Sequence, residues 1–278
     1  ALNKDGRLLW SVEMAAGRLL PPLLFSTGTV VVADTTGRVV ALTHAGREIW
    51  SISLDEELSC APVVLHDGTM VFGGVRGNLH YLEQSGASAG VRFVGEVPSA
   101  LAPADGALLV GTTSGNLIKL DAEREPAWRA DLGSAVAHLV IGEEPSESEQ
   151  NGTVSAYTVL DDGSLVRVSS EGTAVWRLQP EPERIVNIAA AGKGGDVLVA
   201  GSGGPLAQIS RRGDQMWEAR IPTSPRTMTM DGEGRILVST ERWVTYAYAT
   251  DLSLDGAWPL PRGTVAETGV PPGVTTGR

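Results

Sequence analysis

A large aromatic residue recurs at intervals of about 40 residues along this chain of 278 residues. The spacings of 40, 43, 35, 48, 41 and 41 positions belong to one series: Trp10, Trp50, Phe93, Trp128, Trp176, Trp217 and Trp258. Four of the tryptophans follow a glycine by four residues, as Trp50 follows Gly46. A fixed period of this length indicates a repeat architecture, in which each unit packs on its neighbours.

Pairs of glycines frame an apolar run in most repeats. Four pairs lie nine residues apart and a fifth is stretched to 11: Gly28 and Gly37, Gly68 and Gly77, Gly106 and Gly115, Gly195 and Gly204, then Gly152 and Gly163. The runs are short, β-rich and almost continuously apolar, as in strands that are covered on both faces. Four short strands in each unit of about 40 residues predict an all-β fold, a β-propeller of four-stranded antiparallel blades. A β-sandwich is the alternative, but it carries no such period.

Six complete repeats are legible, and a seventh aromatic is surplus. Residues 1–10 align without gaps on residues 41–50, so the chain opens partway through a blade. Either this opening segment completes the last blade, or residues upstream of Ala1 are missing and the propeller has seven or eight blades. We expect one propeller domain over residues 1–278, with residues 259–278 as a C-terminal tail.

The seven aromatic residues are expected to be structural anchors. A large flat ring on the outer strand of a blade can fill the wedge that opens between neighbouring blades. Burial of such a ring contributes a few kcal/mol, on the order of 2–3.

Composition excludes several classes of partner. A net charge of −11 and the lack of a Lys/Arg cluster argue against nucleic acid, because binding a polyanion needs a basic surface. No apolar run is long enough for a transmembrane helix, so membrane association would come through a partner or through an anchor upstream of Ala1. The single cysteine, Cys60, lies in an apolar run and is expected to be a buried thiol.

The chain offers no convincing catalytic, cofactor or metal motif. Its four histidines occupy different places in different repeats, without the spacing of a metal site. Glycine-rich segments such as residues 192–195 precede no helical pattern, so they lack the helix N-terminus that binds a phosphate. We therefore expect no catalytic residue, no cofactor and no metal.

Residues 41–50, together with the preceding Gly28–Gly37 frame, resemble the repeat of pyrroloquinoline-quinone-like (PQQ-like) β-propellers. Residues 258–263 also resemble the Trp-Pro-Xaa-Xaa-Arg-Gly box that flanks such propellers. That family includes quinoprotein dehydrogenases and the BamB-type lipoproteins of outer-membrane barrel assembly. Dehydrogenases of the family carry a vicinal cysteine pair and a calcium site, whereas Cys60 has no cysteine neighbour.

The resemblance implies the non-catalytic, BamB-like branch: a scaffold for protein partners in an envelope or membrane-associated assembly, periplasmic or otherwise extracytoplasmic. A ligand-binding or sensing propeller that uses its central funnel is the alternative. An enzyme like the quinoprotein dehydrogenases is a weaker one.

One turn position differs among the repeats. Five repeats place glycine there (Gly37, Gly77, Gly115, Gly163 and Gly204), whereas the sixth has Trp243, preceded by Arg242. A tryptophan beside an arginine is typical of a binding hot spot; the alternative is that Trp243 packs on a neighbouring blade. The same face is expected to carry four more candidates for partner binding: Arg38, Arg76, Asn78 and Asn116. Its mixed charge favours a protein partner.

Overall fold

The computed structural model describes residues 1–3, 7–14, 17–104, 106–143, 154–179, 185–191, 195–230, 235–242 and 244–249. Over these ranges the regular structure consists of β-strands, β1 to β23. The strands divide between two compact units, residues 1–135 and residues 136–249.

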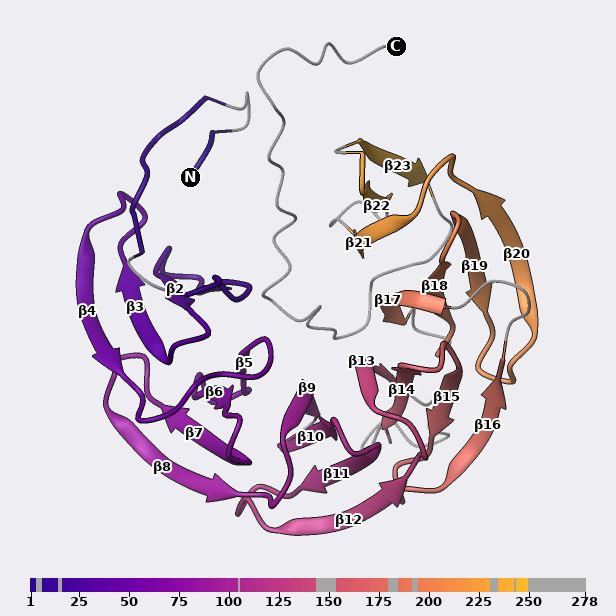
Figure 1. The fold of residues 1–278 in the computed structure, drawn as a ribbon, viewed down its shortest axis with the longest axis horizontal. Helices are drawn as coiled ribbons and strands as arrows, with labels where there is room; N and C mark the ends of the chain where they lie inside the picture. The colour runs from indigo at the N-terminus through magenta and orange to yellow at the C-terminus, as the bar shows by residue number, and fades with distance from the viewer. Residues whose placement is uncertain are drawn as a thin grey trace. The chain divides into compact units, whose positions relative to one another are not determined.

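Unit 1 consists of three four-stranded antiparallel sheets (Figure 1). In each sheet the strands pair in chain order, so each is a meander. The first sheet holds β1 (Leu23–Leu24), β2 (Val30–Ala33), β3 (Arg38–Leu42) and β4 (Glu48–Ser53). The second holds β5 (Val63–Val64), β6 (Met70–Gly73), β7 (Asn78–Leu82) and β8 (Ser88–Phe93). The third holds β9 (Pro98–Ala104), β10 (Ala107–Thr112), β11 (Asn116–Leu120) and β12 (Pro126–Asp131).

Unit 2 repeats the same meander. One sheet holds β13 (Val136–Glu143), β14 (Val154–Leu160), β15 (Leu165–Val168) and β16 (Ala174–Leu178). The next holds β17 (Ile185–Ala191), β18 (Val197–Gly201), β19 (Pro205–Ile209) and β20 (Gln215–Arg220). The last described sheet has three strands, β21 (Pro225–Met230), β22 (Arg235–Thr240) and β23 (Thr245–Ala249). These six sheets correspond to the six repeats of the sequence.

Burial follows the hydrophobic pattern of each strand. Most residues of the second strands are apolar and buried, as β6 is at all four positions, whereas the outer strands such as β4 alternate between half-buried and exposed residues. Within unit 1, the side chains of Leu23 and Val31 from the first sheet join Phe72 of the second in one apolar cluster. Neighbouring sheets of a unit are therefore held together by apolar packing.

Tryptophan and glycine form a recurring contact between neighbouring sheets. The Nε1–H of Trp50 donates to the carbonyl oxygen of Gln84 in the β7–β8 turn, at 2.9 Å. A Cβ atom on Gly86 of that turn would lie 2.9 Å from the Trp50 ring. The same contact joins Trp10 to the turn at Gly46 and Trp176 to the turn at Gly213. Gly46 and Gly213, each the glycine of a Gly-Xaa-Xaa-Xaa-Trp unit, therefore receive the tryptophan of the preceding repeat.

Two of the other expected anchors are half-buried on outer strands. Trp128 pairs with Lys119 across β11 and β12. Trp217 donates its Nε1–H to Oε1 of Gln208 in its own sheet and packs on the core cluster of the last two sheets. Trp258 lies outside the described residues.

Phe93 does not belong to this series, and the prediction that it is an anchor is wrong. Phe93 pairs with Asn78, and its side chain is 64% exposed. The residue in the register of Trp50 is Gly90, which pairs with Tyr81 as Trp50 pairs with Ala41. Phe93 lies three residues after the position that corresponds to Trp50, so its spacing comes close to the period without matching it.

Residues 1–3 and 7–10 pair with one another as the end of β3 pairs with the start of β4. Leu2 and Leu8 form an antiparallel bridge, and the N–H of Asn3 donates to the carbonyl of Arg7 at 2.9 Å. Trp10 then contacts the turn before β4. For residues 1–3 and 7–10, the sequence alignment with residues 41–50 thus corresponds to a similar pairing in the structure.

Candidate interaction surface

The turn between β6 and β7 is held by a buried carboxylate. Glu56 comes from the segment between β4 and β5, and its side chain is 1% exposed. Its Oε2 accepts hydrogen bonds from the N–H of Arg76 at 3.2 Å and from Nδ2 of Asn78 at 3.3 Å. Its Oε1 lies 2.7 Å from Nε2 of His80. One side chain therefore satisfies three polar groups of the turn, which fixes the turn on the preceding connection.

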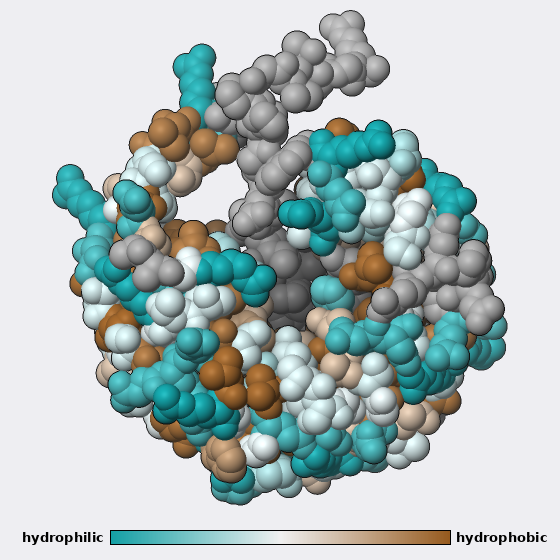
Figure 2. All heavy atoms as spheres, in the orientation of Figure 1, coloured by the Kyte–Doolittle hydropathy of each residue, from teal (hydrophilic) through white to brown (hydrophobic). Residues whose placement is uncertain are grey.

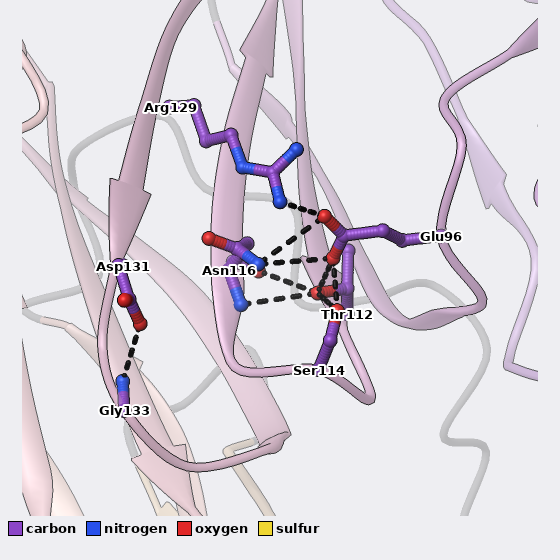
Figure 3. A network of polar contacts seen from close by, with 7 residues as sticks. All are labelled: Glu96, Thr112, Ser114, Asn116, Arg129, Asp131 and Gly133. Atoms are coloured by element: carbon purple, nitrogen blue, oxygen red, sulfur yellow. Dashed lines mark hydrogen bonds and ion pairs between the residues drawn. The ribbon is translucent and has the colours of Figure 1, made fainter.

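Glu96 does the same for the turn between β10 and β11 (Figure 3). Its Oε2 accepts hydrogen bonds from Oγ1 of Thr112 at 2.7 Å and from the hydroxyl of Ser114. Nδ2 of Asn116 donates to both carboxylate oxygens, at 3.1 and 3.2 Å, and Arg129 of β12 forms an ion pair with Oε1. Glu96 and Glu56 occupy the same repeat position, 40 residues apart.

In the first sheet the carboxylate comes from the turn between β2 and β3, and not from the segment that precedes the sheet. The bridges Leu58–Gly74 and Leu19–Asp34 align Glu56 with Gly17 and Gly74 with Asp34. Oδ1 of Asp34 accepts from the N–H and hydroxyl of Thr36, at 2.9 and 2.5 Å.

Each of these two sheets then has a glycine opposite its carboxylate. A Cβ on Gly17 would lie 3.0 Å from Cγ of Asp34, and one on Gly74 would lie 1.8 Å from Oε1 of Glu56. Each site thus has room for one acidic side chain, from either the connection or the turn.

These contacts decide what the predicted partner-binding residues do. Asn116 is buried, and its side chain bonds to Glu96, while the side chain of Asn78 bonds to Glu56. Both asparagines therefore hold turns of the fold, and the buried Asn116 offers no open contact surface. Arg76 is exposed and uses only its backbone N–H in the turn, and Arg38 is half-buried, with its N–H 3.3 Å from Oδ1 of Asp34.

The other two candidates lie in unit 2. Arg242 is exposed at the turn after β22. Trp243 lies outside the described residues, so its contact with a partner remains a prediction. Glu56 and Glu96 share a repeat position, but the first sheet has Gly17 there, so the repeat pattern does not predict their role.

Two titratable groups have clearly shifted pKa values. Burial raises the pKa of the Cys60 thiol to about 12, although hydrogen bonds with Ser59 and the backbone of Gly73 oppose the shift. Burial also lowers the pKa of His138, against a backbone hydrogen bond with Val186 and the charge of Asp161. Both groups are neutral at pH 7, because burial disfavours the charged form of each.

The described residues contain no cluster of three or more histidine, cysteine or acidic side chains that could hold a metal ion. Nor, over the same ranges, is there a helix with the length and apolarity needed to cross a bilayer. The face of unit 1 seen in Figure 2 mixes hydrophilic and hydrophobic side chains. Such a surface suits contacts with proteins better than contacts with a polyanion.

The successive four-stranded antiparallel meanders are typical of a β-propeller, and solved structures agree. BamB from Moraxella catarrhalis aligns with a TM-score of 0.70 at 17% identity, over 89% of this chain and 74% of that one. BBS1N in its complex with ARL6DN gives 0.68 at 15% identity, over 86% and 79% of the two chains. The computationally designed Ika8 protein gives 0.68 at 15% identity, over 88% and 75%.

The sequence family described as outer membrane protein assembly factor BamB matches residues 1–88 and 83–252. The chain therefore belongs to this family of PQQ-like repeat propellers, as its repeats predicted. No curated protein sequence matches the chain.

Proposed function

We propose that this protein is a non-catalytic scaffold that binds protein partners in an envelope or membrane-associated assembly, outside the cytoplasm. The observation that carries the proposal is the use of buried carboxylates to fix the turns. Glu56 and Glu96 form hydrogen bonds with the turns next to them, so these polar residues make the turns rigid. A rigid rim that leaves Arg76 exposed is suited to a partner that docks without rearranging it.

The family and the solved relatives support this proposal. The matching family is described by a role in outer-membrane protein assembly, and one structural relative was solved in complex with another protein. Both point to association rather than to turnover of a substrate.

Affinity capture from a detergent-solubilised envelope fraction of the source organism tests the proposal. We expect the wild-type chain to retain a defined partner, and Arg76→Glu to retain less of it because the reversed charge lies on the exposed rim. Arg212→Glu, at an exposed turn of unit 2, is the matched control. A chain that captures no partner and instead turns over a substrate would refute the scaffold function.

A further inference from the structure

The outer strand β8 has the polarity of its two faces reversed relative to the other outer strands. At the two inward positions the others have Trp50 and Ile52 on β4, Trp128 and Ala130 on β12, Trp176 and Leu178 on β16, and Trp217 and Ala219 on β20. Strand β8 has Gly90 and Arg92 there. At the outward positions β8 exposes Val91 and Phe93, to 57% and 64%. The other outer strands have polar residues there, such as Ser51 and Ser53 on β4 or Arg129 and Asp131 on β12.

The reversal is compensated at the boundary with the third sheet. Arg92 forms a bidentate ion pair with Glu125, at 2.6 and 2.7 Å. Arg124 donates to the carbonyl of Ala89 at 2.6 Å and stacks over the ring of Tyr81, 4.0 Å from its centroid. A shift of β8 by one residue would break all of these contacts. These contacts therefore fix the register of β8, and this register directs the side chains of Val91 and Phe93 outward.

The outer edge of β8 carries backbone groups that pair with no described strand. The N–H of Val94 donates to the carbonyl of Gly77, so Val94 and alternate residues before it direct their backbone groups toward β7. Val91 and Phe93 then direct theirs to the outer edge. Strand β8 ends its sheet, and no described strand pairs with that edge. Charged outward residues protect the edges of β12 and β20, and β8 lacks them.

We propose that the β8 edge binds an extended segment of another protein by strand addition, with two apolar side chains at alternating positions against Val91 and Phe93 and a lysine or arginine beside them. The basic residue follows from charge: Glu123 is exposed in the neighbouring turn, and the chain as a whole has a net charge of −11. A second copy of the chain would bring the same net charge of −11 to the edge, so like charges oppose it. Backbone hydrogen bonds provide affinity in this mode, and alternate side chains provide specificity.

The inference deepens the scaffold function and rests on it. Its test uses a short fluorescein-labelled peptide of alternating lysine and valine, followed by fluorescence anisotropy. The key variant is the full chain with Val91→Arg and Phe93→Asp, which installs the outward pair of β12 without changing the net charge. Val175→Arg with Met216→Asp is the matched control, since these side chains are exposed to 48% and 60% on other outer strands.

We expect the β8 variant to bind the peptide roughly tenfold more weakly, and the control to bind as the wild type does. A peptide with glutamate in place of lysine, or with N-methyl groups on alternate amides, should bind weakly to every variant. Equal binding to wild type and β8 variant, or equal binding of the glutamate peptide, would overturn the proposal.

Benzoylphenylalanine in place of Phe93 identifies the occupant by photocrosslinking. A crosslink to the peptide supports the proposal, whereas a crosslink to a second copy or to residues 250–278 of the same chain overturns it. The two hypotheses fail separately: envelope partners captured equally by wild type and β8 variant would retain the scaffold function and remove β8 as its surface.

Discussion

Gly90 and Arg124 exchange the roles that Trp50 and Gly86 play one sheet earlier. In the first contact the large side chain comes from the outer strand and the turn provides glycine. In the second the outer strand provides Gly90, and Arg124 comes from the turn, with its Nη1 3.0 Å from where a Cβ of Gly90 would lie. Arg124 keeps the glycine-like backbone of that turn position, with φ at 67°. The boundary is thus filled from the opposite side.

Replacing Arg124 should separate its contacts from its backbone strain. Arg124→Ala loses the hydrogen bond to Ala89 and the stacking on Tyr81, so we expect a loss of about 2 kcal/mol in the free energy of unfolding. Arg124→Gly loses the same contacts but relieves the positive φ, so it should be about 1 kcal/mol more stable than the alanine variant. Urea unfolding followed by tryptophan fluorescence measures both. Equal stability of the two variants would show that the backbone strain is negligible.

The contact between Gly86 and Trp50 should make Gly86 less replaceable than other turn glycines. Gly86→Ala places a Cβ 2.9 Å from the ring at φ +85°, whereas Gly95, at φ +83°, has nothing within 4 Å. Both alanine variants lose about 1 kcal/mol to backbone strain. We expect Gly86→Ala to lose a further 1–3 kcal/mol or so because the ring must move. Thermal unfolding of the two variants provides the comparison, and equal losses would contradict the role assigned to the ring.

The regular contacts were predictable from sequence, and the exchanged ones were not. The period that relates Trp10 to Trp50 is visible because most of the outer strands carry a tryptophan at the same place. The irregular spacings on either side of Phe93 indicate that Phe93 is not a member of the series. Gly90 fits the period better, since it lies 40 residues after Trp50 and 38 before Trp128. The role of Gly90 cannot be inferred from the sequence, because glycine has no side chain. The role of Arg124 can be inferred only when the structure shows that its turn contacts β8.

The buried carboxylates are a second feature that could not be predicted from the sequence repeat. Glu56 and Gly74 do together what Gly17 and Asp34 do in the first sheet, with the residue types reversed. A repeat pattern compares the residue types at one position at a time. It therefore registers two variable positions, whereas the structure keeps one glycine and one acidic residue in contact in both sheets. Spatial complementarity is conserved between these two sheets, but the residue at each position is not.

Transplanting the arrangement of the first sheet into the second tests this equivalence. Gly74→Asp alone should lose about 3 kcal/mol or more, because the new side chain overlaps the buried Glu56 carboxylate. Glu56→Gly alone should lose about 3 kcal/mol, since Asn78 and His80 lose their acceptor.

The double variant should recover at least half of the summed loss, measured as a coupling free energy in urea unfolding. Glu57→Ala, at the exposed neighbouring residue, should leave stability unchanged and serves as the control. Strictly additive losses would refute the equivalence of the two sites.

The Cys60 thiol should report the opening of unit 1. Its pKa of about 12 and its buried position leave almost no accessible thiolate, the form that reacts with disulfide reagents. We expect negligible labelling of the native chain at a pH of about 8 and complete labelling in denaturing guanidinium. Gly73→Ala, whose Cβ would lie 2.8 Å from Sγ, should accelerate native labelling by loosening the packing. Rapid labelling of the native wild type would contradict the burial of Cys60.

His138 should make unit 2 less stable in mild acid. Burial lowers its pKa in the folded chain, and in the unfolded chain the imidazole has its ordinary pKa of about 6.5. The unfolded state therefore binds the proton more readily, so the contribution of His138 to stability is complete above about pH 6.5 and declines as the pH falls toward the folded value. His138→Gln cannot be protonated, and we expect its urea midpoint to fall less than that of the wild type between about pH 7.5 and about pH 5.5. If the two midpoints fall in parallel, His138 is not the group that senses this range.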